Sequence, residues 1–182
     1  VQHDWEICTT DISKAFLQGV TYEELSEITG EEIREVNFTL PRGSEEILMK
    51  LPGFADFSPE REVLHCDKPG TGLVDAPRAF SIKVGQVTIR SGLRPTSVDP
   101  ELVSKHEQGY LIMMMTKHVD DLKIAGPRPY VLWIVDLLQT TFGPLKLEWN
   151  KFVNCGVQHI HIVASREITL DQDAYIDALK PI

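Results

Sequence analysis

Apolar and polar positions alternate along this chain in a way that predicts short strands separated by helices. Strand-sized apolar or alternating stretches occur at residues 5–9, 35–40, 102–104, 110–116, 122–125, 158–163 and 168–170. Helical spacing is clearest at residues 129–141, where Val131, Ile134, Val135 and Leu138 form one apolar stripe. Because the strands follow one another in meander and hairpin order, the pattern predicts an α+β fold with helices packed on one face of an antiparallel sheet.

Local signals mark where the other helices begin and end. Thr21 opens a capping-box sequence and Gly30 provides a stop, which predicts a helix over about 22–28. Asp75 is placed as the N-cap of a second helix with an early proline, and Gly92 ends that helix. A last helix is expected over about residues 171–179.

The composition is that of a globular protein in a reducing setting, without a membrane-spanning segment. With 42% hydrophobic and 25% charged residues, the chain has the balance of a globular domain. The longest apolar run, Leu111 to Met115, is too short to cross a bilayer, so no membrane partner is expected. Three widely spaced cysteines without a C-x-x-C pair favour a reducing intracellular setting.

The organisation of the chain suggests one region of a longer protein. We find no internal repeat or low-complexity linker, so residues 1–182 are interpreted as a single domain. The chain starts with Val1 rather than Met, directly before an apolar stretch, which predicts a fragment. The net charge of −9 is unfavourable for phosphate contacts, but many of the acids are glutamates clustered between residues 23 and 35. Net charge alone therefore excludes no nucleic-acid partner.

Three aspartates are the candidate catalytic residues. Asp120 and Asp121 lie between two apolar stretches, which places them at a hairpin tip. Two adjacent carboxylates repel each other unless a cation lies beside them, although aspartate is also common in turns. Asp11 ends another apolar stretch, where it is either an N-cap for the residues after it or a third carboxylate. Carboxylates at the ends of neighbouring strands can hold hard cations, and two such cations about 4 Å apart promote phosphoryl transfer.

Five segments, taken in order, form a family pattern. They are D-I-S-K-A-F-L-Q-G at 11–19, G-L-V-D-A-P-R-A-F at 72–80, D-P-E-L-V at 99–103, H-V-D-D at 118–121 and I-T-L-D-Q-D-A-Y-I at 168–176. Each resembles a motif of the copia-type LTR retrotransposon reverse transcriptases, including their D-x-x-x-A-F-L-x-G, G-L-K-Q-A-P-R-x-W and Y-V-D-D elements. The resemblance covers the chain from Asp11 to about Leu179.

The resemblance implies the palm of a right-hand polymerase and an RNA-directed DNA polymerase activity. Asp11, Asp120 and Asp121 would be the catalytic carboxylates and the ligands of two Mg²⁺ ions, or of Mn²⁺ in their place. The implied partners are an RNA or DNA template with its primer, deoxynucleoside triphosphates, and the rest of a Pol polyprotein with integrase and RNase H. Such a protein would work in a cytoplasmic virus-like particle or in the nucleus.

The same resemblance implies contacts with the substrate. Backbone amides around Lys14 and Ala15 would face the triphosphate, and Gly72 would lie on the substrate path. Phe16 would be the steric gate that favours deoxynucleotides, or else an ordinary core aromatic. Lys146 would protonate the pyrophosphate leaving group, or else be one exposed lysine among many.

The chain departs from the family pattern at four positions. Thr71 replaces an aromatic residue, Val74 replaces Lys, Asp75 replaces Gln, and His118 replaces Tyr. The changes at Val74 and Asp75 are expected to weaken phosphate contacts. Two alternatives therefore stay open: a truncated or decayed retroelement fragment that keeps only the fold and weak binding, and another two-metal phosphotransferase such as a nuclease.

Three other features are interpreted as structural. His159 and His161 alternate on a predicted strand and are assigned to a surface face rather than to a zinc site. The methionines at 113–115 are assigned to a buried strand. Trp133, beside the apolar stripe of its helix, is assigned to the core.

Overall fold

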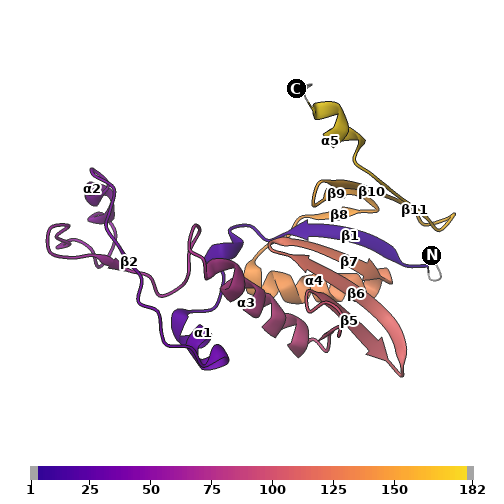
Figure 1. The fold of residues 1–182 in the computed structure, drawn as a ribbon, viewed down its shortest axis with the longest axis horizontal. Coiled ribbons are helices and arrows are strands. Elements are labelled where there is room, and N and C mark those ends of the chain that lie inside the picture. Colours follow the sequence, from indigo (N-terminus) through magenta and orange to yellow (C-terminus); the bar gives the residue numbers. More distant parts are fainter. Residues whose placement is uncertain (1–3, 180–182) are drawn as a thin grey trace.

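The computed structural model describes residues 4–179, which form a six-stranded antiparallel sheet with further layers on both faces. The strand order is β4-β5-β6-β7-β1-β8, so the first strand lies between β7 and β8 (Figure 1). The strands are β1 (Glu6–Asp11), β4 (Arg94–Pro95), β5 (Leu102–Glu107), β6 (Tyr110–His118), β7 (Asp121–Gly126) and β8 (Leu147–Trp149). The predicted antiparallel sheet is confirmed.

Two long helices, α3 (Ala76–Arg90) and α4 (Arg128–Phe142), cover one face of this sheet. The predicted stripe of α4 is buried along its whole length. Together with Phe80 and Val84 of α3, it packs against apolar side chains of β6 and β7, namely Met113, Met115, Leu122 and Ile124. None of the helices between residues 4 and 179 has the length and apolar composition that a bilayer crossing needs.

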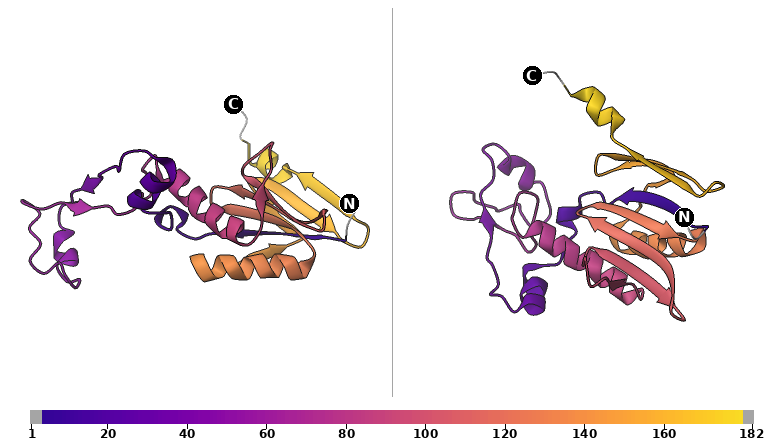
Figure 2. Two further views of the ribbon diagram at one scale, coloured as in Figure 1. Left: turned by 90° about the horizontal axis from the view of Figure 1, so that it is seen from below. Right: turned by 45° about the vertical axis from the view of Figure 1, so that its right-hand side comes forward.

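A second, three-stranded sheet covers the opposite face, which was not predicted. It has the order β11-β10-β9 and consists of β9 (Lys151–Asn154), β10 (Val157–Ile162) and β11 (Glu167–Asp171), followed by α5 (Asp173–Ala178). Figure 2 shows α4 and these yellow strands on opposite sides of the main sheet. Asn154 Nδ2 donates to Thr9 Oγ1 at 3.3 Å, and this bond joins the two sheets.

The assignment of His159 and His161 to a surface is wrong, because the small sheet turns both rings toward the main sheet. Their side chains are buried, and the His159 ring stacks on Phe152 with centroids 5.0 Å apart. His159 Nδ1 lies 2.9 Å from the Val157 carbonyl oxygen, and Nε2 lies 3.3 Å from Lys123 Nζ. Both contacts are satisfied by a neutral ring that donates from Nδ1 and accepts at Nε2.

The burial of these two histidines predicts acid sensitivity. Burial lowers the pKa of both His159 and His161 below the ordinary 6.5, so the folded chain binds fewer protons than the unfolded chain near that pH. The free energy of unfolding is therefore expected to fall as the pH falls through about 6.5. Chemical denaturation between pH 7.5 and 5, estimated to bracket the histidine range, measures this effect. His159→Gln should reduce the slope and His106→Gln, at an exposed position, should leave it unchanged; equal slopes in all three proteins would contradict the prediction.

The helix predicted over 22–28 is confirmed as α1 (Tyr22–Thr29), with both hydrogen bonds of its capping box and a left-handed Gly30 at its end.

The prediction that Trp133 belongs to the core is wrong, because this residue remains 37% exposed on α4. The α4 stripe packs inward, and Trp133 lies beside it.

An irregular arm connects α1 to α3 and extends away from the main sheet (Figure 1). It contains β2 (Asn37–Phe38), α2 (Glu45–Leu48) and β3 (Leu64–His65), and β2 pairs with β3. The strand expected over 35–40 is thus only two residues long. Both residues of this strand are exposed, and Phe38 keeps 46% of its surface accessible.

Candidate carboxylate site

The structure brings the three aspartates together at one end of the main sheet. Asp11 is the last residue of β1 and lies directly opposite Asp121, the first residue of β7, in the antiparallel register. Residues directly opposite each other in such a pair carry their side chains on the same face. The amide of Ile12 donates to the carbonyl of Asp120 at 3.1 Å, which joins the tip of the β6–β7 hairpin to the end of β1.

The hairpin tip itself is a tight turn. Val119, between His118 and Asp120, has a left-handed backbone with φ of 56°, which is uncommon for a β-branched residue. His118 lies opposite Asp121 in the register and is exposed. The turn therefore consists of Val119 and Asp120, and Asp121 begins β7 directly after it, opposite Asp11.

Electrostatics at this end of the sheet are unfavourable without a cation. The pKa of Asp11 is raised from 3.8, mainly by desolvation and next by the negative charges of Asp120 and Asp121, with a side-chain hydrogen bond to Asp120 adding to the effect. Carboxylate oxygens are the ligands that Mg²⁺ prefers, so the donor chemistry of the three residues fits this ion. Among residues 4–179, however, no three His, Cys, Asp or Glu side chains are grouped closely enough to hold a metal. The aspartates are neighbours here, without forming a complete ligand set.

A polar pocket of about 400 Å³ opens beside Asp11 and Asp121. Its other lining residues come from β1, the turn after it, the loop before β8, β8 and β9, and are Thr9, Thr10, Ser13, Pro144, Lys146, Glu148 and Val153. Lys146, which sequence reasoning named as a leaving-group acid, thus lines the same pocket as two of the aspartates. Its side chain is 86% exposed, which agrees equally with the alternative that Lys146 is an ordinary surface lysine.

Glu148 is a pocket residue that sequence reasoning missed. Its Oε1 lies 2.8 Å from Lys146 Nζ, and β8 places Glu148 opposite Thr9, two residues before Asp11. The hydrogen bond and charge of Glu148 raise the pKa of Lys146 above its ordinary value. The only signal in the sequence was that Glu148 follows Lys146 by two residues, because the pairing of β8 with β1 cannot be read from the sequence.

The proposed triphosphate-facing residues follow β1 directly. Lys14 has a left-handed backbone with φ of 56° and begins a short 3-10 helix, η1 (Ala15–Leu17). Ala15 is buried, and the half-buried ring of Phe16 packs against the main core cluster. Phe16 does not line the carboxylate pocket, which favours the alternative of an ordinary core aromatic.

Two of the segments that carry the family resemblance pack directly on each other. A Cβ at Gly19 would lie 3.0 Å from the backbone of Ala79, so only glycine allows α3 to approach this closely. The amide of Val20 donates to the carbonyl of Ala79 at 3.2 Å in the same contact. Gly72, in contrast, is exposed in a turn with φ of 92° and lies outside the pocket.

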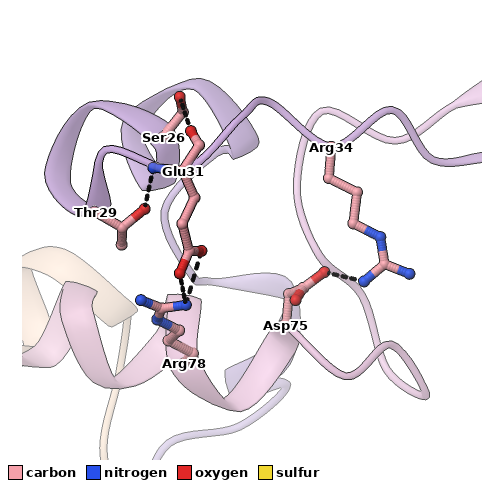
Figure 3. Close-up of polar contacts among 6 residues, drawn as sticks. All are labelled: Ser26, Thr29, Glu31, Arg34, Asp75 and Arg78. Carbon is pink, nitrogen blue, oxygen red and sulfur yellow. Dashed lines mark hydrogen bonds and ion pairs between the residues drawn. The ribbon is translucent and has the colours of Figure 1, made fainter.

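Asp75, one of the departures from the family pattern, has an ion-pair partner. Its carboxylate lies 2.6 Å from the Arg34 guanidinium, and one turn later Arg78 pairs with Glu31 at 2.9 Å (Figure 3). Asp75 occupies the N-cap position of α3 but makes no capping hydrogen bond with its side chain, because the carboxylate is directed to Arg34. The expected extra negative charge on a phosphate path is therefore offset by Arg34.

The chain matches no family model and no curated protein. Among solved structures, it is similar to the apo telomerase from Candida tropicalis truncated from its C-terminal domain, at 10% sequence identity and a TM-score of 0.48. The similarity covers 92% of this chain, which spans about 35% of the length of that telomerase chain. The likeness is distant in both sequence and structure, and by itself it assigns neither a family nor an activity.

Proposed function

We propose that this protein is the palm region of an RNA-directed DNA polymerase of the copia-type retroelements. The observation that carries the proposal is the cross-strand pair of Asp11 and Asp121, with Asp120 in the adjoining turn. These are the carboxylates that the family motifs assign to catalysis. They come from two segments far apart in the sequence and meet at one sheet end.

Asp11, Asp120 and Asp121 would hold two Mg²⁺ ions, or Mn²⁺ in their place. When bound, such ions activate an attacking hydroxyl and stabilise a leaving oxygen in phosphoryl transfer. Lys146, held by Glu148, would keep a proton available to the pyrophosphate. Lys14, Ala15, Phe16 and Gly72 stay as proposed contacts with the deoxynucleotide or template.

The proposed reaction joins a deoxynucleotide to the 3′-hydroxyl of a primer annealed to an RNA or DNA template. The other proposed partners are the integrase and RNase H regions of a Pol polyprotein, in a cytoplasmic particle or in the nucleus. A net charge of −9 offers little attraction for a template-primer duplex, so most of the phosphate contacts would come from other regions.

A second candidate is a retroelement fragment that keeps the fold without catalysis. It is favoured by the lack, between residues 4 and 179, of a group of three metal-ligand side chains. It is also favoured by the single cation in the pocket lining, Lys146. Weak binding of nucleic acid or protein would then be the remaining function.

A primer-extension assay separates the two candidates. The 182 residues alone are expected not to extend a primer with Mg²⁺ and deoxynucleotides, because misplacement of the reacting groups by ~1 Å can cost ~100-fold in rate. The same residues, expressed with their neighbouring coding sequence, are expected to extend it, and Asp120→Asn should abolish the extension. Glu45→Gln, on the remote arm, is the matched control and should have no effect. An inactive longer protein would support the non-catalytic candidate.

A further inference from the structure

Trp133 lines two hollows on the helical side of the molecule, and none of Asp11, Asp120 and Asp121 lines either of them. The first hollow, of about 290 Å³, is lined by Trp133 together with Lys105, Glu107, Pro129 and Tyr130. A second hollow, of about 430 Å³, is also lined by Trp133, together with Val87, Arg90, Ser91, Leu137, Thr140 and Thr141. Trp133 lines both hollows, whose other lining residues come from α3, α4, β5 and Ser91, and the two hollows together are called the trough below.

The walls of the trough are built mainly from apolar and aromatic groups. Trp133 keeps 37% of its surface exposed, and Val87 and Leu137 are only partly covered where they line the second hollow. Each hollow is large enough for a side chain of the size of leucine or phenylalanine. Exposed tryptophan and arginine in such a setting are the residue types that dominate binding energy at protein interfaces.

The charge at the rim of the trough is opposite to that of the chain. Lys105 lies with its Nζ 4.9 Å from the Trp133 ring centroid, and Arg90 is exposed at the end of α3. The carboxylate in the lining, Glu107, already contacts Lys105 and accepts a hydrogen bond from the Tyr130 hydroxyl at 2.8 Å. Within residues 4–179, the exposed side chain of Arg90 makes no hydrogen bond or ion pair.

We propose that this trough is a docking surface for an acidic amphipathic segment of a partner protein. The two hollows would take two apolar anchors on one face of a helix, as in other helix-in-groove complexes. Carboxylates beside the anchors would pair with Arg90 and Lys105. An apolar lining with two cations fits this occupant better than a nucleic acid, whose phosphates need several Lys or Arg contacts.

The probe for this proposal is a fluorescein-labelled peptide of about 16 residues, long enough to hold some helix. It carries leucine at positions i, i+3, i+4 and i+7 and glutamate at most others, and a matched peptide carries lysine in place of glutamate. Fluorescence anisotropy with the wild-type protein should show saturable binding of the acidic peptide and none of the basic one. Equal binding of both peptides, or no binding of either, would overturn the proposal.

Four variants locate the binding. Trp133→Ala and Arg90→Glu should each weaken binding of the acidic peptide by about tenfold or more, which is the loss of roughly 1.4 kcal/mol typical of an important interface residue. Leu132→Ala is the matched control for Trp133, because Leu132 is exposed on the same helix but lines neither hollow. Arg42→Glu, at an exposed position on the arm, is the charge control. Both controls should bind as wild type does.

Other occupants give different results. If the trough joins two copies of this chain, sedimentation velocity will show a dimer that Trp133→Ala dissociates. If it takes nucleic acid, a labelled single-stranded oligonucleotide will bind and Arg90→Glu will release it. Either result, or an equal loss of peptide binding in Leu132→Ala, refutes the proposed occupant. Because Arg90 is exposed, Arg90→Glu tests the site even if Trp133→Ala lowers stability.

Discussion

Replacing Phe80 by alanine is expected to lower the free energy of unfolding by about 3–5 kcal/mol, the usual cost of removing a buried phenylalanine ring. Phe80 is completely buried on α3 and meets the ring of Phe142 edge-on, with centroids 5.8 Å apart. Through these contacts it joins α3 to α4 and both helices to the sheet. The cavity left by alanine cannot close easily, because rigid elements surround it.

Chemical denaturation at neutral pH measures this loss. Phe38→Ala is the matched control, because Phe38 lies on the arm with 46% of its surface exposed. Its cost should stay within about 0.5 kcal/mol, the usual range for surface changes. A similar loss for both variants would contradict the prediction, because it would show that burial in the structure does not decide the cost of losing the ring.

The sequence predicts the structure best where the contacts that determine it are local. The capping box at Thr21 and the left-handed Gly30 need only residues within α1, and both were found as predicted. The apolar stripe of α4 has a period that only a helix can bury on one side. In each case, the residues that decide the structure lie within one or two turns of each other.

Prediction fails where the deciding partner is distant in the sequence. His159 and His161 alternate as on any half-exposed strand, and only the stacking of the small sheet on β1 and β7 buries them. Asp75 has the sequence context of a helix cap, but Arg34 takes its carboxylate instead. Trp133 lies next to the correctly predicted apolar stripe of α4. The packing of α3 against α4 buries the stripe and leaves Trp133 outside the core.

The candidate site lies between these two cases. Both strand ends could be recognised from the sequence, since Asp11 follows one apolar stretch and Asp120-Asp121 precedes another. The register that sets Asp11 opposite Asp121 depends on β1 pairing with β7, which local patterns do not specify. Glu148 enters the pocket by the same kind of long-range pairing, through β8.

Replacing Asp11 by asparagine is expected to remove the increase in stability that divalent cations give the protein. In metal-free buffer at neutral pH, the variant should be at least as stable as the wild type. The pKa of Asp11 is raised in the folded chain, so its contribution to stability is present below the ordinary value of 3.8 and lost as the pH rises through the folded pKa. The side chain of asparagine does not ionise, so it does not repel the carboxylates of Asp120 and Asp121.

Addition of Mg²⁺ should reverse this order of stability. A cation that binds only the folded protein stabilises it by mass action, so the unfolding temperature of the wild type should rise with Mg²⁺ concentration. That of Asp11→Asn should not, and in a protein active in primer extension the same change should lower the rate at least about 100-fold. Asp56→Asn, on the exposed arm, is the control and should keep the wild-type response. An identical Mg²⁺ response in Asp11→Asn and wild type would show that the cation binds elsewhere, and would leave the three aspartates without the role proposed for them.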